Sequence, residues 1–544
     1  MTTTAPPDAA DPAPATAHAP ARPQPPMPRP QWPGWAAAVA LALFAGVLRF
    51  IRLGQPPEIY FDETYYAKDA FSLWRFGYEH ETLDNADDLL AQGVPQIWSG
   101  GPDFVVHPPV GKWMIALGDQ LWGLLPFGTS MTPEGWRVAS AFIGALTVLI
   151  MVRVALRMTR SWLLAAAAGL LLALDGLHFT MSRLAMVDVF VTFWVLAAFA
   201  CLLVDRDRMR DRLAASPGAA WLGVRWWRLA AGLCLGLAVG TKWNALFFMA
   251  AFGLLTVAWD YGARRSAGQS RGGGLRDLRL RWLLFDAIPA FVQTVVVGAV
   301  VYVASWAGWF ASSGAYDRQW GAENAGAGVS RLPDQLEGPV NALRGLIHYH
   351  AQMMEFHSGL SEPHDYASQP WDWLIMRVPV AFFYDGESGG CGTEKCSTAI
   401  LSIGTPALWW IGLVALAVML GWWLTYRDWR AGAVLLCVAA GWLPWFAYPD
   451  RTMFVFYALP FLPFVVLAIV LMLGLAMGDG EKGAAYLPAR RAMGGVLFGV
   501  VLLLVIANFA FLYPVLSAET IPYDQWAQRM WFDTWIFGSG GGSG

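Results

Sequence analysis

The feature that most limits the fold of this chain is a succession of long apolar runs. A bilayer core about 30 Å thick needs about 20 apolar residues in each helix that crosses it, and the sequence holds about eleven runs near this length. They lie near 33–53, 136–157, 161–178, 183–204, 226–241, 243–260, 282–306, 402–425, 431–448, 452–477 and 491–514. Only 14% of the residues are charged, against about 25% in an average soluble protein. The sequence therefore predicts an all-α polytopic membrane protein with about eleven transmembrane helices.

The net charge and the cysteine content exclude two further classes of protein. The formal net charge is -3, so the chain offers no basic surface for nucleic acid. The 5 cysteines in 544 residues are too few for a disulfide scaffold.

The two ends of the chain differ from the apolar runs. Residues 1–31 are rich in Pro and Ala and show no apolar period, so we expect a disordered cytoplasmic tail. This tail lacks the charged start and the cleavage pattern of a signal peptide, so the first run, 32–53, is expected to remain as the first transmembrane helix. Residues 538–544 have the Gly-Ser composition of an artificial linker.

The basic residues predict the orientation of the helices. Lys and Arg in short loops stay in the cytoplasm, and arginines cluster in the loops 205–228 and 260–281. Two long loops then face outward, 54–135 and 307–401, and the first holds 12 acidic and 3 basic residues. We therefore expect a multi-pass protein of the plasma (cell) membrane with its N-terminus in the cytoplasm and its active site and C-terminus outside. Transmembrane helices 2–7 occupy 136–306, helices 8–11 occupy 402–515, and 516–537 is an extracytoplasmic C-terminal segment.

Two adjacent carboxylates follow the first apolar run. Asp62 and Glu63 stand among aromatic residues in the segment Ile59–Tyr66, close to the expected membrane surface. Surroundings of low dielectric raise the pKa of a carboxyl toward the range useful for a general base. The same acids could instead cap a helix that starts near Thr64, because acids are favoured in a first turn. The pattern alone leaves both interpretations open.

Several cations are expected at the outer ends of the helices. His107 and Lys112 flank a Pro-Pro pair, which stiffens the entry to an interfacial helix. Arg137, Arg183 and Lys242 lie at outer helix ends, against the positive-inside tendency. A guanidinium can hold two phosphate oxygens at once, so a lipid phosphate is a natural ligand. The alternatives are ion pairs with nearby acids and, for the lysines, snorkelling to the interface.

The second long loop holds two polar clusters. His350 lies five residues before Glu355 and seven before His357, so one helix face could present them as metal ligands or as part of a hydrogen-bond network. Cys391 and Cys396 enclose four residues. In an oxidising outer location such a pair favours a short disulfide loop over a zinc site.

Several ordered motifs together resemble those of the protein O-mannosyltransferases, which use dolichyl- or polyprenyl-phosphate-mannose. The motifs are Ile59–Tyr66, His107–Lys112, Ser182–Asp188, Gly240–Trp243, His364–Ser368 and Arg451–Pro463. The match covers most of 33–515 and implies the GT-C fold. Eukaryotic members carry a large lectin-like insertion in the second long loop, and 307–401 leaves no room for one. The resemblance is therefore to the bacterial, actinobacterial form.

The resemblance also implies a reaction. Mannose passes from a polyprenyl phosphate to Ser or Thr hydroxyls of secreted or membrane proteins at the outer face, with inversion. Asp62 would be the general base, and Glu63 would position the acceptor or share that role. The expected ligands of the donor phosphate are Arg137, Arg183, Lys242 and Lys112, and the expected acceptor or loop network is His107, His350, His364 and Tyr366.

The implied partners follow from this reaction. They are polyprenyl-phosphate-mannose, secreted acceptors with Ser/Thr-rich segments, membrane lipid and the secretion translocon, with no nucleic acid. The resemblance implies no definite cofactor. The donor phosphate could be neutralised by arginines alone or could share a divalent metal with Asp62 and Glu63, and both arrangements use the same residue types.

Three other classes stay open on the sequence. A related GT-C transferase that glycosylates a lipid or a polysaccharide would share the donor side of the site. A transporter is less favoured, because the charges gather at the outer helix ends and no internal repeat is visible. A non-catalytic assembly subunit would be indicated if replacing Asp62 left every activity unchanged.

Overall fold

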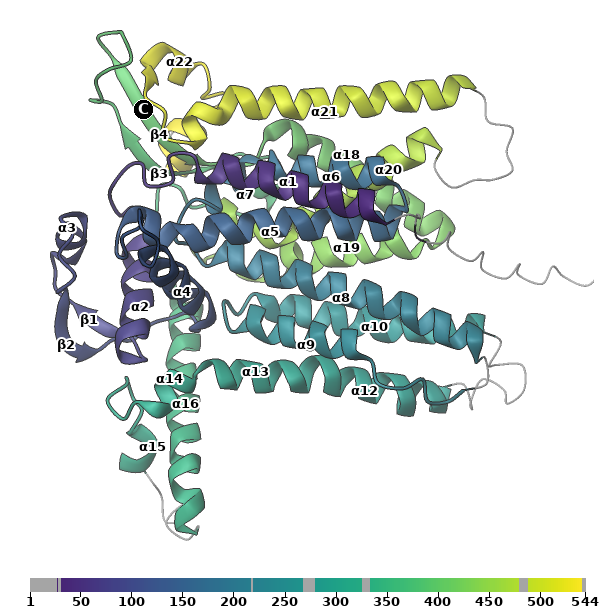
Figure 1. Ribbon diagram of the computed structural model, residues 1–544, viewed down its shortest axis with the longest axis horizontal. Helices are drawn as coiled ribbons and strands as arrows, with labels where there is room; N and C mark the ends of the chain where they lie inside the picture. Colours follow the sequence, from purple (N-terminus) through teal and green to yellow (C-terminus); the bar gives the residue numbers. More distant parts are fainter. Residues whose placement is uncertain are drawn as a thin grey trace, which may run out of the picture.

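The computed structural model describes residues 27, 31–216, 219–267, 279–324, 333–478 and 488–540. Almost all of the predicted tail 1–31 lies outside these residues, as do 541–544 of the predicted linker. The described chain is mostly helical, and its long helices run side by side in one bundle (Figure 1).

Nine helices among the described residues are long and apolar enough to cross a membrane. These spans are α1 (Trp32–Phe50), α5 (Pro133–Thr159), α8 (Asp188–Ala215), α10 (Ala245–Ser266), the run Arg279–Ser305 that ends in α13 (Val297–Ser305), α18 (Pro406–Tyr426), Trp429–Ala447 with α19 (Trp429–Trp442), Val455–Met477 with α20 (Leu462–Met477), and Arg491–Leu516 within α21 (Pro488–Leu516). Two shorter apolar helices, α6 (Trp162–Ala173) and α9 (Trp226–Val239), lie at the other predicted positions. The predicted multi-pass protein is confirmed, and the number of about eleven spans is not.

Burial separates a central helix from its neighbours. The Val455–Met477 span is 89% buried inside the protein, whereas the α1, Arg279–Ser305 and α21 spans are each 22% buried. A helix that is apolar on all sides suits either a protein interior or lipid. Here α20 occupies the interior, and the three less buried spans present most of their surface outward.

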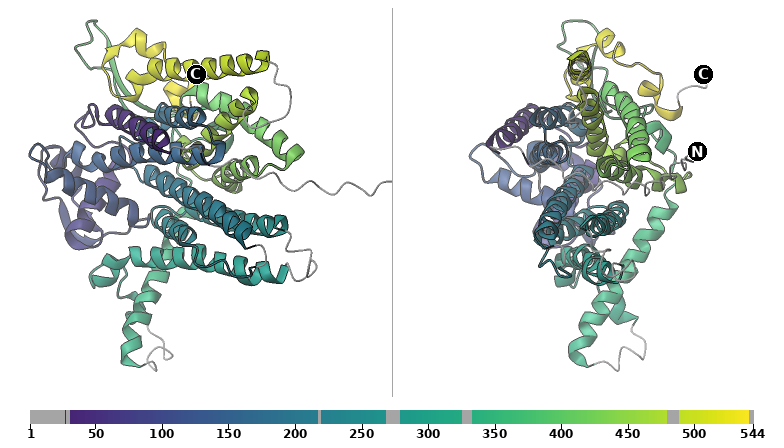
Figure 2. Two further views of the ribbon diagram at one scale, coloured as in Figure 1. Left: turned by 45° about the vertical axis from the view of Figure 1, so that its right-hand side comes forward. Right: turned by 90° about the vertical axis from the view of Figure 1, so that its right-hand side faces the viewer.

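The two long loops fold into compact structure at one end of the bundle, on the left in Figure 1. The first forms α2 (Glu63–Phe76), β1 (His80–Thr82), α3 (Ala86–Ala91), β2 (Trp98–Pro102) and α4 (Val110–Gly123). The second forms α14 (Ala307–Ala311), α15 (Trp320–Glu323), α16 (Asp334–Gly359), α17 (Pro370–Trp373), β3 (Val380–Asp385) and β4 (Cys396–Ser402). Helix α16 crosses this end at a steep angle to the spanning helices (Figures 1 and 2).

A small antiparallel sheet joins the second loop to the C-terminal segment. Its strand order is β3-β4-β5, where β5 is Ile521–Pro522, and every residue of β4 is buried. The segment continues through α22 (Tyr523–Ala527) and α23 (Thr534–Phe537) at the same end. The sequence analysis predicted helices alone, so the two small sheets of the described chain are an addition to that prediction.

Candidate active site

Asp62 stands at the turn that leads into α2, directly after a strained residue. Phe61 has φ of 56°, a left-handed conformation that costs energy for a bulky side chain. Within the described residues the Asp62 carboxylate receives no hydrogen bond. Burial raises its pKa to about 6, Lys242 opposes this increase, and Asp188 adds to it. Asp62 therefore combines an unpaired carboxylate with a pKa near that of a general base.

Glu63 and Arg137 form a fully buried pair. Arg137 donates from Nε to Oε1 at 2.8 Å and from Nη2 to Oε2 at 2.7 Å. Its remaining hydrogens reach the carbonyl oxygens of Pro56 and Glu58, and Glu63 also accepts from the Ala185 amide at 2.9 Å. The predicted roles of Glu63 in acceptor binding and of Arg137 in phosphate binding stay predictions, and in this structure the two groups are buried and bonded to each other. The pair fixes the loop that presents Asp62.

Arg183 has the same kind of internal role. Its guanidinium donates to the carbonyl oxygens of Arg49 at 2.8 Å, Ile51 at 2.7 Å and Arg52 at 3.1 Å. These carbonyls end α1, where a cation complements the negative end of the helix dipole. The role of Arg183 in binding the donor phosphate stays a prediction, and in this structure its guanidinium binds backbone carbonyls.

Lys112 is also occupied. Its ammonium is buried, forms an ion pair with Glu79, and lies 3.6 Å from an oxygen of Asp69. Burial raises the pKa of Asp69 to about 7, with Lys112 opposing this increase. Lys112 connects α4 to α2 and to the segment before β1, and its predicted role in phosphate binding stays a prediction.

Lys242 is the predicted phosphate ligand that remains beside Asp62. It follows α9, and its Nζ lies 2.9 and 3.1 Å from the two oxygens of Asp188. It also lies 4.6 Å from the ring centroid of Tyr457. From sequence, Asp188 was one of the nearby acids that could pair with the outer arginines. In the structure Asp188 lies at the start of α8, forms an ion pair with Lys242 and borders the site.

Arg451 supplies a second cation. It donates to the carbonyl oxygen of His357 and lies 3.4 Å from the Nδ1 of that ring. In the part of the chain that the structure describes, its Nε has no partner and no carboxylate pairs with it. Among the cations considered at this end, Arg451 alone has no carboxylate or set of carbonyl partners that saturates it. From sequence, Arg451 is an outer-end arginine that could contact a phosphate or pair with the adjacent Asp450, and within the described residues it does not pair with Asp450.

Two histidines accompany Arg451. His357 donates from Nε2 to the Val106 carbonyl oxygen at 2.8 Å, and its ring stacks on His107 with centroids 5.2 Å apart. Burial and the nearby cations lower the pKa of His357 to about 4 and lower the pKa of His107 well below its usual range. Both rings are therefore neutral at pH 7, and His107 lies in the predicted network.

His350 belongs to a separate chain of hydrogen bonds. Trp243 donates to the Tyr302 hydroxyl at 3.0 Å, and that hydroxyl lies 2.5 Å from Nε2 of His350. The opposite ring nitrogen lies 2.7 Å from the Leu346 carbonyl oxygen. The chain ties α16 to the segment that carries Lys242. Over the described ranges, no group of three His, Cys, Asp or Glu side chains is arranged to hold a metal ion.

Aromatic rings surround the residue before Asp62. Phe61 packs against Phe382 with centroids 4.8 Å apart, and His364 meets Phe454 at 5.0 Å. His364 is exposed and Tyr366 is half-buried beside it. These predicted network residues therefore border the Asp62 turn on the side of β3. Cys391 and Cys396 are joined by a disulfide in the connection between β3 and β4.

Two family models and several relatives match this chain. The family model "Dolichyl-phosphate-mannose-protein mannosyltransferase" matches residues 83–261, and "C-terminal four TMM region of protein-O-mannosyltransferase" matches residues 342–535. A polyprenol-phosphate-mannose–protein mannosyltransferase of Mycolicibacterium smegmatis is 37% identical, covering 94% of this chain and 96% of the relative. The Corynebacterium glutamicum protein of the same name is 30% identical, covering 91% of this chain and 92% of the relative.

A solved structure shows the same fold. One chain of the Saccharomyces cerevisiae protein O-mannosyltransferase Pmt1-Pmt2 complex bound to the sugar donor matches with a TM-score of 0.68 at 14% identity. The match covers 92% of both chains. The predicted GT-C fold is therefore confirmed.

Proposed function

The chain belongs to the protein O-mannosyltransferase family, and we propose that it transfers mannose from polyprenyl-phosphate-mannose to Ser and Thr hydroxyls of proteins. Relatives named polyprenol-phosphate-mannose–protein mannosyltransferase match it over 91–94% of its length. The chain spans 92–96% of those relatives, so no large part of them is missing from it.

The unpaired Asp62 carboxylate is the observation that carries the chemistry. A pKa of about 6 leaves this group ionised at pH 7 while it remains basic enough to accept a proton. Asp62 takes the proton of the acceptor hydroxyl as that oxygen attacks the anomeric carbon. The bond between this carbon and the phosphate oxygen breaks, and a single displacement inverts the configuration.

Lys242 and Arg451 stabilise the departing phosphate. Negative charge builds on the phosphate oxygen as the glycosidic bond breaks, and fixed cations in a site of low dielectric lower the barrier most effectively. Arg451 has hydrogens free for this contact, and Lys242 keeps at least one of its three N–H donors while Asp188 neutralises part of its charge. Arg137, Arg183 and Lys112 support the site from within the fold. A divalent metal that joins the phosphate to Asp62 is an alternative that the assay below includes.

The site's place in the fold also supports a protein acceptor outside the cell. Asp62 lies at the end of the bundle formed by the two long loops, opposite the arginine-rich loop 205–228. The positive-inside tendency supports a cytoplasmic position for that arginine-rich end, and the site then faces outward, in our proposal from the plasma membrane. Extended Ser/Thr-rich segments that emerge from the secretion translocon suit such a site, because their hydroxyls are not yet buried in a fold.

The test is transfer of radiolabelled mannose from polyprenyl-phosphate-mannose to a Ser/Thr-rich peptide by purified full-length protein. We expect labelled peptide with the wild type, a loss of about 10²–10⁴-fold with Asp62→Asn, and unchanged transfer with the control Asp88→Asn. Asp88 is exposed at the same end of the bundle. Parallel samples with a chelator show whether a metal takes part.

Three results contradict parts of the proposal. Label recovered only in a lipid product would favour the related GT-C transferase with a lipid acceptor. Equal transfer by Asp62→Asn and the wild type would remove Asp62 as the base. If a chelator abolished transfer and an added divalent metal restored it, the phosphate would need a metal ion and not the amino-acid cations alone.

A further inference from the structure

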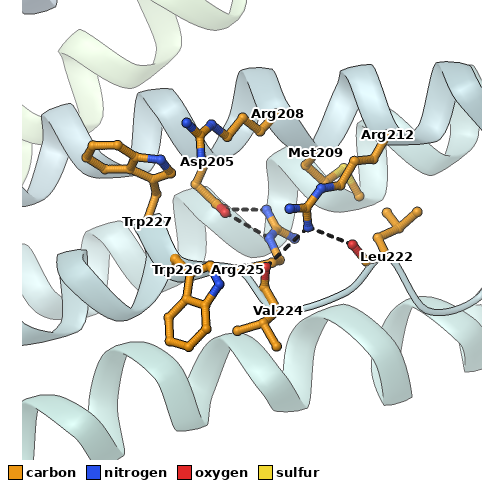
Figure 3. Close-up of a pocket in the computed structure, with 9 residues that line it drawn as sticks. All are labelled: Asp205, Arg208, Met209, Arg212, Leu222, Val224, Arg225, Trp226 and Trp227. Atoms are coloured by element: carbon orange, nitrogen blue, oxygen red, sulfur yellow. Dashed lines mark hydrogen bonds and ion pairs between the residues drawn. The ribbon is translucent and has the colours of Figure 1, made fainter.

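A second cationic site lies at the end of the bundle opposite Asp62. The last turns of α8 and the segment that leads into α9 form a shallow pocket there (Figure 3). The pocket is lined by Asp205, Arg208, Met209, Arg212, Leu222, Val224, Arg225, Trp226 and Trp227. None of these residues takes part in the proposed catalytic reaction.

The floor of the pocket is electrically balanced. Arg225 donates from Nε to Asp205 at 3.0 Å and from Nη1 to Asp260 at 2.7 Å. Arg228 pairs with the same two aspartates, and Arg264 pairs with Asp286. Three arginines thus meet three aspartates in a buried cluster, and no net charge is left there to attract a ligand.

Arg208 and Arg212 add charge that this cluster does not neutralise. They lie four residues apart on α8, so they share one helix face. No carboxylate within the described residues forms an ion pair with either side chain, and both are exposed. Arg212 donates to the carbonyl oxygens of Leu222 and Val224 at 2.6 and 3.2 Å, and Arg208 lies 5.3 Å from the Trp227 ring centroid. These contacts orient both guanidiniums over the pocket without reducing their charge (Figure 3).

The surface around these arginines is apolar and aromatic. Trp226 is 68% exposed, Trp221 57% and Val224 43%. Exposed tryptophans at the end of a membrane-spanning helix are typical of the boundary between headgroups and acyl chains. A soluble anion would gain nothing from these side chains, whereas a lipid would place its acyl chains against them.

We propose that this pocket binds the headgroup phosphate of an anionic phospholipid in the leaflet opposite Asp62. Arginine suits this ligand because its planar fork holds phosphate oxygens and its charge persists at every physiological pH. Basic pockets between helix ends on the cytoplasmic side are a recognised way to hold such headgroups. The bound lipid contacts both α8 and the start of α9, so it stabilises the packing of these two helices.

The test measures thermal unfolding of the purified full-length protein in a neutral detergent with added lipid. A ligand that binds only the folded state raises the melting temperature. We expect phosphatidylglycerol to raise Tm by at least about 2 °C more than phosphatidylcholine does. The double variant Arg208→Ala/Arg212→Ala should lose this difference. The control Arg491→Ala should keep it, because Arg491 is an exposed arginine at the same end on α21.

Three results would overturn the proposal. The first is an equal response to phosphatidylglycerol and phosphatidylcholine in the wild type. The second is an unchanged phosphatidylglycerol response in the double variant. In the third, inorganic phosphate produces the same increase, which would assign the pocket to a soluble anion. Native mass spectrometry of retained lipid, with Arg208→Lys/Arg212→Lys as the charge-preserving variant, separates loss of binding from loss of folding.

Discussion

Both ends of the helix bundle contain buried charges within the described residues, but the two ends arrange them differently. At the end opposite the site, Arg225, Arg228 and Arg264 are paired with Asp205, Asp260 and Asp286. At the Asp62 end, saturated pairs surround two groups, Asp62 and Arg451, that have no partner of opposite charge within the described residues. The first arrangement holds helices together, and the second leaves charge available for a ligand.

Whether a charged group has a partner of opposite charge distinguishes structural from functional charges more clearly than its burial does. Arg137 and Arg228 are both completely buried, and each meets carboxylates on another element. Removing one partner of such a pair leaves an uncompensated charge in a medium of low dielectric. Replacing Asp62 leaves no buried ion-pair partner uncompensated within the described residues. Substitutions at the two kinds of position should therefore affect different measurements.

The largest expected effect on stability is in the balanced cluster. Arg228→Met leaves Asp205 and Asp260 with excess negative charge, and breaking a buried pair in this way costs about 3–5 kcal/mol. We expect a large fall in Tm of the purified protein, whereas mannose transfer per folded molecule changes little. Arg491→Met is the control at an exposed arginine. A Tm equal to that of the wild type would show that the cluster does not stabilise the bundle.

For a substitution of Arg451 we expect the opposite pattern, a loss of activity with little change in stability. Arg451→Gln keeps a donor for the His357 carbonyl but removes the cation, so we expect kcat to fall about 10²–10³-fold, or about 2.7–4 kcal/mol in the barrier. Tm should stay close to the wild-type value, because no carboxylate is left unpaired. Steady-state kinetics with polyprenyl-phosphate-mannose measures this. A change confined to KM would contradict a role in stabilising the leaving phosphate.

The spans, and the carboxylate that we propose as the base, could be picked out from sequence because both are local features. Apolar runs specify where helices cross the membrane, and Asp62 stands in a short motif beside aromatic residues. Helix ends, the two short helices and the β-strands depended on packing, which hydropathy does not report. The sheet β3-β4-β5, for example, needs residues near 521 to reach β4.

Charge pairing could not be predicted in the same way. Glu63 and Arg137 are 74 residues apart in sequence, and Arg183 finds its acceptors at the end of α1, more than 130 residues away. The sequence therefore gave four similar candidates for the donor phosphate, and only the fold shows which of them already have bonded partners. Arg451 was a weaker candidate, because its sequence neighbour Asp450 offered a local partner that it does not use within the described residues.

The acid side of the pH profile tests the state of Asp62. A general base works only when deprotonated, and its pKa in the free protein is about 6. We expect kcat/KM to be level above this pH and to fall about tenfold for each pH unit below it. The measurement is transfer rate at low donor concentration from pH 4.5 to 8. A profile that stays level down to pH 5 would show that the site does not raise the pKa of this carboxyl.

The smallest expected effects are shifts of this pH profile caused by the pair that borders Asp62, Asp188 and Lys242, and the two shifts have opposite signs. Asp188→Asn removes a negative charge that disfavours ionisation of Asp62 and leaves the Lys242 charge unshared, so both changes lower the pKa of Asp62. The acid limb of the profile should then move to lower pH. Lys242→Met removes the charge that favours ionisation, so the limb should move to higher pH, together with weaker phosphate stabilisation. Shifts in the same direction would mean that the two substitutions act through altered packing, and the electrostatic coupling of this pair to Asp62 would be wrong.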